Sequence, residues 1–550
     1  MASSISRRKA ITYGAGAVAA GVLGGGIGLD AARARGLARG ARPALDPELP
    51  QPRVLSSVDG ELSLRLTGIA GVVDMNAPKP VRTYTFDGLV PGYTWEMRAG
   101  DTLKVHLRNR LPELPPMPIR MDRPHQWTNM NLHTHGLHVS PRGNADNVFL
   151  DIPPGEDHRL RIPLPADHPA GMFWYHPHRH GGVTQQLRAG MAGLIIVRGD
   201  IDEVPEVAAA QEKIMVLQSI ELGDDFQLLD PIPEPTKEQS FFPRTNVLYT
   251  VNGVLTPRLR MYPGEVQRWR ILNAAEGKFM SLNLKSHEFH TLAWDGLTLP
   301  APDTSDVLML SSGNRVEVLV KAGAPGVYDL VLTPGSSQKP NIPGMPPSGS
   351  AGPADGGMPM PGFPPLRGEL DPRPILTIEV SGSGPEMGLP TALPAFDPPI
   401  LPIARRRHFS FTVQRTPDNE FLNFGVDGRP YDMAAPPYRV PLGTAEEWTL
   451  ENAFDPKLME HAHVFHIHTN PFKITKRNGQ VLDPPLWRDT YVLTKSAGDT
   501  ITFESNFVDF PGEFVEHCHV VAHEDLGMMS AIEVVRRFPP HPGQSQSESE

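Results

Sequence analysis

Three segments of the chain repeat one short pattern, a tight turn followed by a strand that ends on asparagine. The turn is Asp-Gly or Asn-Gly, at residues 87–88, 252–253 and 427–428. A glycine and then the asparagine follow at the same interval in each copy, at residues 100–109, 264–273 and 443–452. Asp-Gly and Asn-Gly favour β-hairpins because both turn residues must adopt positive φ. The repeat therefore predicts three related β units rather than a helical protein.

The segments after these turns alternate apolar and polar side chains. Residues 102–107 and 266–271 show the period-two pattern that is typical of strands with one buried face. The 60 prolines and 51 glycines favour turns over long helices, and 39% hydrophobic residues suffice for several cores. We predict an all-β protein with three β-sandwich domains, at residues 46–203, 204–385 and 406–537.

The segments between and after these domains differ in composition. An insertion that contains proline, glycine and methionine occupies residues 338–365 of the second domain, and a proline-rich linker occupies residues 386–405. The chain ends in a polar, acidic tail at residues 538–550. Because these segments hold few apolar residues, we do not expect them to form packed cores.

Residues 1–45 are interpreted as an export leader. Arg7 and Arg8 form a twin-arginine pattern, and the apolar stretch after them is diluted by glycine and too short for a permanent membrane span. Such signals pass folded proteins to the twin-arginine (Tat) export machinery, which predicts a periplasmic or extracellular protein. A disordered basic tail is the alternative. A formal charge of −11, with no basic run in the body of the chain, argues against nucleic-acid partners.

Four His-x-His pairs carry the most specific chemical signal. The pairs are His133 with His135, His176 with His178, His466 with His468, and His517 with His519. All four lie in β-rich sequence, where side chains two positions apart share one face of a strand. Each pair therefore points one way, and eight imidazoles are far too many for a single ion. The pattern predicts a cluster of several metal ions. The other histidines, including His138 and His180, are expected beside the ligands or at the surface.

Cys518 is the only cysteine of the chain, so it forms no intrachain disulfide. It lies between the two histidines of the last pair and therefore points to the opposite face. His463 precedes the third pair by an odd number of positions and can also point away from the cluster. With His523 and Met528 from the following loop, the set is one thiolate, two imidazoles and a thioether. This combination is typical of a blue-copper centre, whereas zinc, the alternative, does not favour a thioether.

The four motifs, their order and the triple repeat resemble the multicopper oxidases, a family that includes laccases, cuprous oxidases, ferroxidases and bilirubin oxidases. The resemblance covers residues 50–535, and residues 519–529 look most like the exported copper-efflux oxidases and bacterial laccases. It implies three cupredoxin-like Greek-key domains and four coppers per chain. His463, Cys518, His523 and Met528 would bind type 1 copper. Type 2 copper would have His133 and His466. The type 3 pair would have His135, His176, His178, His468, His517 and His519.

The resemblance also implies a reaction. Four one-electron oxidations of substrate at the type 1 copper would be followed by transfer of the electrons through Cys518 to the trinuclear cluster, where four electrons and four protons reduce dioxygen to two waters. This reduction consumes protons. Glu524 occupies the position of a proton-donating glutamate in the copper-efflux branch, and Asp146 matches the acid beside the type 2 site. The alternative for both is a loop carboxylate or a helix cap.

The reducing substrate is less constrained than the metal ligands. Met345, Met358 and Met360 of the insertion are soft ligands for Cu(I), as are methionines in the cuprous oxidases. Cuprous oxidases also place acids and methionines close to the type 1 site; Met459 and Glu460, shortly before His463, could serve in this way, but the local sequence departs from the pattern of that branch. A phenol or aromatic amine is therefore the leading expectation, and Cu(I) or another metal ion is the alternative. Two further classes, a copper nitrite reductase and a non-catalytic cell-envelope protein, are disfavoured because all eight cluster histidines are present.

Overall fold

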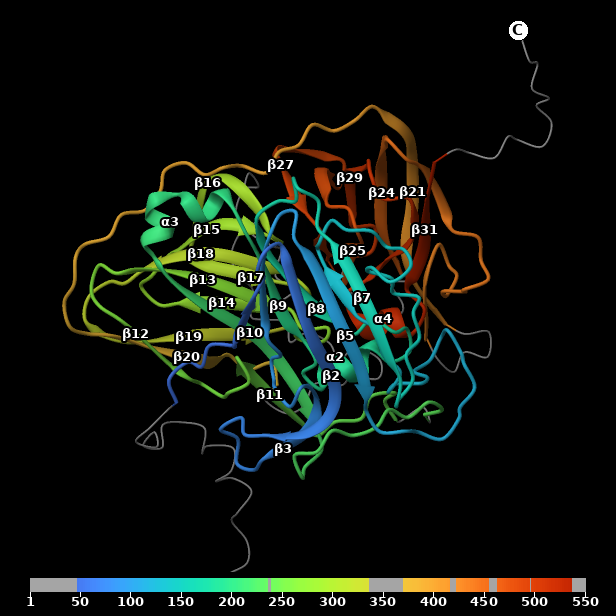
Figure 1. Ribbon diagram of the computed structural model, residues 1–550, viewed down its shortest axis with the longest axis horizontal. Coiled ribbons are helices and arrows are strands. Elements are labelled where there is room, and N and C mark those ends of the chain that lie inside the picture. Colours follow the sequence, from blue (N-terminus) through green and yellow to red (C-terminus); the bar gives the residue numbers. More distant parts are fainter. Residues whose placement is uncertain are drawn as a thin grey trace, which may run out of the picture. The chain divides into compact units, whose positions relative to one another are not determined.

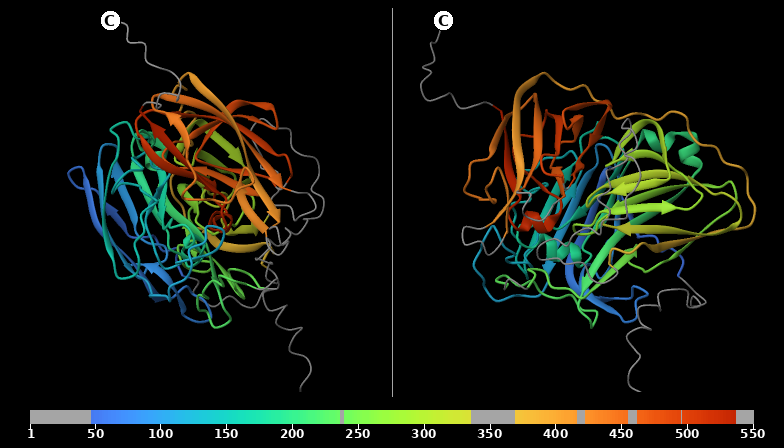
Figure 2. Two further views of the ribbon diagram at one scale, coloured as in Figure 1. Left: turned by 90° about the vertical axis from the view of Figure 1, so that its right-hand side faces the viewer. Right: turned by 180° about the vertical axis from the view of Figure 1, so that it is seen from behind.

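The computed structural model describes residues 47–235, 239–335, 369–415, 422–454, 462–494 and 496–536. These residues form three successive pairs of β-sheets, which follow the chain from blue through green and yellow to red (Figures 1 and 2). The predicted all-β class is confirmed. The leader, the insertion and the tail that the sequence predicts lie outside the described residues. Within those residues, no helix has the length and apolarity that a membrane crossing requires.

The first sandwich pairs a five-stranded sheet with a four-stranded one. In spatial order, the larger sheet contains β1 (Val54–Ser56), β4 (Thr94–Arg98), β9 (Gly193–Arg198), β8 (Gly171–His176) and β6 (His133–His135). The smaller sheet contains β3 (Val81–Phe86), β2 (Glu61–Val73), β5 (Thr102–Arg110) and β7 (Asp157–Pro163). Three short helices accompany this sandwich. In the chain, α2 (Val183–Arg188) lies between β8 and β9, and η1 (Asp200–Glu203) and α3 (Pro205–Ala209) come after β9.

The second sandwich pairs a six-stranded sheet with a five-stranded one. The larger sheet contains β11 (Asn246–Val251), β10 (Gln211–Leu222), β13 (Val266–Asn273), β18 (Arg315–Lys321), β15 (Phe289–Trp294) and β16 (Leu297–Ser305). The smaller sheet contains β12 (Arg258–Met261), β20 (Arg373–Val380), β19 (Gly326–Pro334), β14 (Met280–Leu284) and β17 (Val307–Leu310).

The third sandwich has the same arrangement as the second. Its larger sheet contains β22 (Leu422–Val426), β21 (Ile403–Arg415), β24 (Thr444–Phe454), β29 (Thr500–Phe507), β26 (Phe472–Arg477) and β27 (Gln480–Arg488). Its smaller sheet contains β23 (Tyr438–Pro441), β31 (Met529–Val535), β30 (Gly512–Cys518), β25 (His463–Ile467) and β28 (Thr490–Leu493). The short helix α4 (Val521–Asp525) connects β30 to β31.

The repeated turn-and-strand pattern has the same structural role in all three sandwiches. Asp87 and Gly88 have φ of 52° and 80°, and the matching residues at 252–253 and 427–428 are also positive. Parallel neighbours β2 and β5, β10 and β13, and β21 and β24 require crossing connections, as in Greek-key sandwiches. The closing asparagine is buried, and in the first copy Asn109 Nδ2 donates to the Thr128 and Ile152 carbonyls. This asparagine thus fixes the loop after its strand.

The third sandwich begins earlier than the sequence predicts. β21 starts at Ile403, whereas residues 386–405 were expected to be linker and 406 the first domain residue. The reason is that residues before 406 already pair with the parallel strand β24, Ile403 opposite Ala445 and Arg405 opposite Glu446, and the ion pairs Arg406–Glu447 and Arg407–Glu446 continue this pairing. The strand therefore extends through a run of arginines that carries no apolar signal.

Candidate metal centres

Two pairs of neighbouring strands carry most of the predicted metal-ligating histidines. In the first sandwich, β6 lies beside β8 with His133 opposite His176, and in the third, β25 lies beside β30 with His466 opposite His517. All eight histidines of the four pairs are buried. Rings from the two sandwiches stack directly, with centroids 3.7 Å apart for His133 and His468. The eight imidazoles therefore form one cluster between the first and third sandwiches, as their spacing predicts.

The ring nitrogens of this histidine cluster gather into three groups. Within each group, the ligand atoms lie within 4.8 Å of one another. The groups are His133, His135 and His466; His135, His176 and His519; and His178, His468 and His517. In the last group the His517 Nε2 atom lies 3.1 Å from that of His178 and 3.3 Å from that of His468. Converging imidazole nitrogens of this kind suit metal ions.

One ring nitrogen of most cluster histidines lacks a hydrogen bond among the described residues, although it is buried. These atoms are Nε2 of His133, His176, His466 and His519, and Nδ1 of His135 and His468. An unsatisfied buried nitrogen is costly unless it has a ligand. Because these atoms face the other imidazoles, the donor set fits metal ions held by neutral histidines.

The opposite nitrogen of the same rings is fixed by a protein group. His133 Nδ1 lies 3.0 Å from Asp146 Oδ2, and His466 Nδ1 donates to the Asp489 carbonyl at 2.7 Å. His176 Nδ1 lies 2.9 Å from the Pro177 carbonyl. Such outer contacts select the tautomer and orient a ligand for its metal. Asp146, predicted from the sequence, thus lies directly behind a cluster histidine.

Burial also determines the charge of these imidazoles. It is the largest cause that lowers the pKa of His135, His176, His466, His468 and His519 well below the usual value, with the neighbouring imidazoles adding to the effect. The pKa values of His178 and His517 fall to about 3 for the same first reason. The rings are therefore neutral at physiological pH, which is the form that binds metal.

A second centre lies within the third sandwich. Cys518 Sγ lies 3.6 Å from the Nδ1 atoms of both His463 and His523, and these two nitrogens are 3.2 Å apart. The loop after Cys518 closes on this thiolate centre, because Cys518 N donates to the Met528 carbonyl and Met528 N to the His523 carbonyl. Burial raises the pKa of the Cys518 thiol to about 12, so the free thiol keeps its proton at physiological pH. Binding of a metal cation to the sulfur displaces that proton.

Glu524 links the two centres. It follows His523 on α4, is fully buried, and has Oε2 3.0 Å from His517 Nδ1 and Oε1 3.5 Å from His178 Nδ1. Burial raises the pKa of Glu524 to about 7, so its carboxyl holds a proton at physiological pH far more readily than an exposed glutamate. The structure therefore places both predicted acids, Asp146 and Glu524, in contact with cluster histidines.

Several residues around the centres carried no sequence signal. Thr490 Oγ1 lies 3.1 Å from His135 Nε2, and Ser312 Oγ lies 3.3 Å from His519 Nδ1. The Asp525 carboxylate on α4 accepts hydrogen bonds from the Gly181 and Thr184 amides, which brings α4 beside α2 (Figure 1). These contacts join residues far apart in the chain, so no local motif reveals them.

The remaining histidines that the sequence singled out lie outside the three groups. His180 Nε2 lies 3.0 Å from the Glu524 carbonyl, so this ring packs behind the acid. His138 is half-buried and bridges the Thr469 carbonyl and Asp509. The first is therefore a neighbour of the centres and the second a link between loops.

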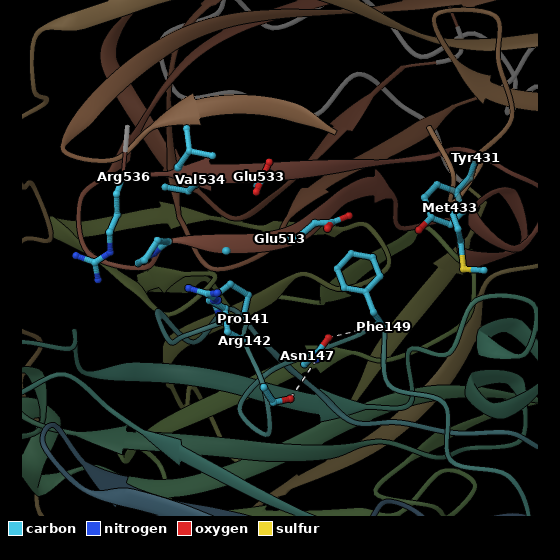
Figure 3. A pocket seen from close by; sticks show the side chains of 14 residues that line it. Pro141, Arg142, Asn147, Phe149, Tyr431, Met433, Glu513, Glu533, Val534 and Arg536 are labelled. Carbon is cyan, nitrogen blue, oxygen red and sulfur yellow. Dashed lines mark hydrogen bonds between the residues drawn. The ribbon is translucent and has the colours of Figure 1, made fainter. Parts of the chain in front are cut away.

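A cavity of 650 Å³ lies between the first and third sandwiches (Figure 3). Its lining includes Arg142, Asn147, Phe149, Tyr431, Glu513 and Glu533. Asn147 directly follows Asp146, so this loop has one residue toward the cluster and the next toward the cavity. The mixture of cationic and anionic groups makes the cavity polar.

The comparison with known proteins adds the family. Three family models, each described as multicopper oxidase, match residues 71–201, 227–345 and 402–537. The chain belongs to the multicopper oxidase family. Its three sandwiches are accordingly cupredoxin-like, its cofactor is copper, and it is an oxidoreductase that uses dioxygen and a reducing substrate.

The relatives of this multicopper oxidase carry different names. A laccase of Bacillus stratosphericus is 23% identical over 507 residues, covering 83% of this chain and 91% of the relative. A cell division protein FtsP of Photorhabdus laumondii is 26% identical over 424 residues, covering 74% and 78%. A solved laccase-like multicopper oxidase, CueO of Ochrobactrum, superposes with a TM-score of 0.66 at 24% identity, over 88% of this chain and all of that one.

Proposed function

We propose that this multicopper oxidase is laccase-like, with a phenol or an aromatic amine as electron donor and four coppers per chain. The arrangement that carries the proposal is the histidine cluster one peptide bond away from the thiolate centre. His463, Cys518, His523 and Met528 would hold type 1 copper. His133 and His466 would hold type 2 copper. His135, His176, His178, His468, His517 and His519 would hold the type 3 pair. Bound copper would supply one-electron transfer and the reduction of dioxygen to water.

The protein groups have separate tasks in this reaction. The buried rings exclude bulk water from the cluster, and their outer hydrogen bonds hold the metal-facing nitrogens in place. The backbone of His517, Cys518 and His519 connects the thiolate centre covalently to the cluster. Glu524 would hold a proton at Oε1 or Oε2 beside His178 and His517, and Asp146 would stabilise the proton on His133 Nδ1.

Aromatic side chains lie beside His523, and one of them is accessible to an aromatic donor. The Phe424 ring stacks on His523 with centroids 4.3 Å apart, and Phe242 packs against Ala522, with Phe241 beside it. Phe424 and Phe242 are buried, whereas Phe241 is partly exposed and is available to stack on a planar apolar substrate. The segments that would favour Cu(I), the insertion at 338–365 and Met459 with Glu460, lie outside the described residues. Cu(I) oxidation is the second candidate, supported by the three methionines of that insertion, which are soft ligands for Cu(I).

Steady-state kinetics on a substituted phenol, Fe(II) and Cu(I), compared side by side, test the donor. We expect the highest kcat/KM for the phenol, and deletion of residues 340–362 should leave that value unchanged. A Cu(I) rate above the phenol rate that falls on this deletion would instead establish a cuprous oxidase. A copper-loaded protein that oxidises none of the three would favour a non-catalytic role, which the name of the FtsP relative raises.

We also propose export by the twin-arginine route. The support is the Arg7-Arg8 pair followed by a weakly apolar stretch. Changing both arginines to lysine should leave the full-length precursor inside the cell, whereas the unaltered chain should appear in the periplasm or medium. Equal export of both proteins would refute this route.

A further inference from the structure

The middle sandwich contains none of the His-x-His motifs, yet one of its loops touches the histidine cluster. The loop joins β17 to β18 and includes Ser312 and Gly313. Ser312 Oγ donates to the Ala275 carbonyl at 2.7 Å, so this oxygen is an acceptor for the Nδ1–H of His519, 3.3 Å away. Gly313 has φ of 87°, and a Cβ at this position would lie 3.1 Å from the His519 ring. The backbone of this loop therefore packs directly against the His519 imidazole and leaves little room for a side chain at residue 313.

Arg315, the first residue of β18, reaches the cluster from the same side. Its guanidinium is fully buried and binds the Asp489 carboxylate through two contacts, Nη1–Oδ1 of 2.8 Å and Nη2–Oδ2 of 2.6 Å. Such a bidentate pair fixes both the position and the plane of the carboxylate. The main-chain carbonyl of the same Asp489 accepts a hydrogen bond from His466 Nδ1. The middle sandwich thus holds the residue that orients His466.

Thr490 extends this support to a second histidine. Its Oγ1 donates to Asp489 Oδ1 at 2.9 Å, which leaves the oxygen as acceptor for His135 Nε2–H at 3.1 Å. Asn314 Nδ2 donates to the Thr490 carbonyl at 3.1 Å. The Arg315–Asp489–Thr490 chain therefore places the proton of His135 on Nε2, and the buried Nδ1 faces the cluster.

We propose that residues 312–315 of the middle sandwich are a positioning element for the copper cluster. Ser312 selects the tautomer of His519, while Arg315 and Asn314, through Asp489 and Thr490, select those of His466 and His135. The proposal rests on the proposed copper-binding role of these histidines. It assigns the middle domain a direct part in forming the cluster. The lack of His-x-His motifs in this domain would otherwise suggest that it only separates the first and third domains.

The test uses the full-length, copper-loaded protein with Ser312→Ala and Arg315→Lys. Ser312→Ala removes one acceptor with little change in volume, and Arg315→Lys keeps the charge but loses the bidentate geometry. The matched control is Arg270→Lys, because Arg270 is equally buried in the same sandwich but binds Glu317 and Glu212, which touch no cluster histidine. Copper per chain is measured during titration with a chelator. The blue colour of the thiolate centre serves as an internal reference.

Loss of an outer hydrogen bond to a metal-ligating histidine lowers metal affinity by about 10–100-fold. We expect a loss of this size for cluster copper in Arg315→Lys, a smaller one in Ser312→Ala, and none in Arg270→Lys, with the blue colour retained in all three. Unaltered copper retention in both test variants would overturn the proposal. So would equal losses from both centres, or a similar loss in the control, because those results indicate general destabilisation. If the unaltered protein bound no copper, the proposed function itself would fail.

Discussion

The histidine cluster and the thiolate centre are one peptide bond apart, but they are built differently. All four predicted ligands of the thiolate centre come from residues 463–528 of the third sandwich. The cluster takes its imidazoles from the first and third sandwiches and contacts with Ser312 and Arg315 from the second. One folded sandwich is sufficient to bring together the first set, whereas the second requires three folded domains. The two centres are therefore expected to respond differently to substitutions.

Cys518→Ser should have the largest effect and should separate the two centres. A serine hydroxyl does not replace the thiolate, so the blue colour and substrate oxidation should fall to background. The cluster ligands remain, and the copper content should fall by about one ion in four, as in a thiolate centre with one ion. Visible absorption and metal analysis on the same sample measure both. Retained oxidation of the phenol would refute the role of Cys518.

His135→Ala should produce the reverse pattern. The substitution removes the imidazole of His135, which belongs to two of the three groups of the cluster. Dioxygen consumption should fall to background while the blue colour persists, because the thiolate centre contains no residue of the first sandwich. An oxygen electrode and visible absorption provide the measurements. Loss of the blue colour together with the activity would show that the centres do not form independently.

Replacement of the acids should slow one half of the reaction and spare the other. For each of the variants Glu524→Gln and Asp146→Asn, we expect the turnover with dioxygen to fall about 10²–10⁴-fold, the usual contribution of a positioned proton donor. Reduction of the thiolate centre by the phenol without oxygen needs no such proton, so the rate at which the blue colour bleaches should be unchanged. Stopped-flow absorption distinguishes the two steps, and equal slowing of both would argue against proton supply.

The smallest expected effect concerns the contact between α4 and α2. Asp525→Asn replaces the carboxylate that accepts from the Gly181 and Thr184 amides by an amide, which has one acceptor oxygen instead of two. Burial raises the pKa of the Asp525 carboxyl to about 7, so it is only partly charged at neutral pH. An ordinary hydrogen bond contributes about 0.5–1.5 kcal/mol, so the free energy of unfolding should decrease by about that amount. Denaturant titration of the copper-free protein measures it. The blue colour should survive, since Asp525 is not among the predicted ligands, and its loss would instead place Asp525 within the thiolate centre.

The sequence predicts what depends on local geometry. Side-chain alternation along a strand separates Cys518 from His517 and His519, and the Asp-Gly and Asn-Gly turns indicate the three sandwiches. Contacts such as Arg315 with Asp489 join residues of different domains, and neither residue belongs to a repeated motif. The same limit applies to β21, whose start at Ile403 depends on pairing with a strand about forty positions later rather than on its own apolar pattern.

The distribution of the cluster along the chain also orders events during synthesis. His135 and His178 belong to the first sandwich, but His519 and His517, which share their groups, are made more than 330 residues later. Domains near the amino end fold first as the chain is made. The first sandwich must therefore wait with its four cluster imidazoles unpaired, and the complete cluster can take up metal only after residues 517–519 of the third sandwich have been made and folded. Loading of the cluster thus reports that the first and third sandwiches have both folded and met.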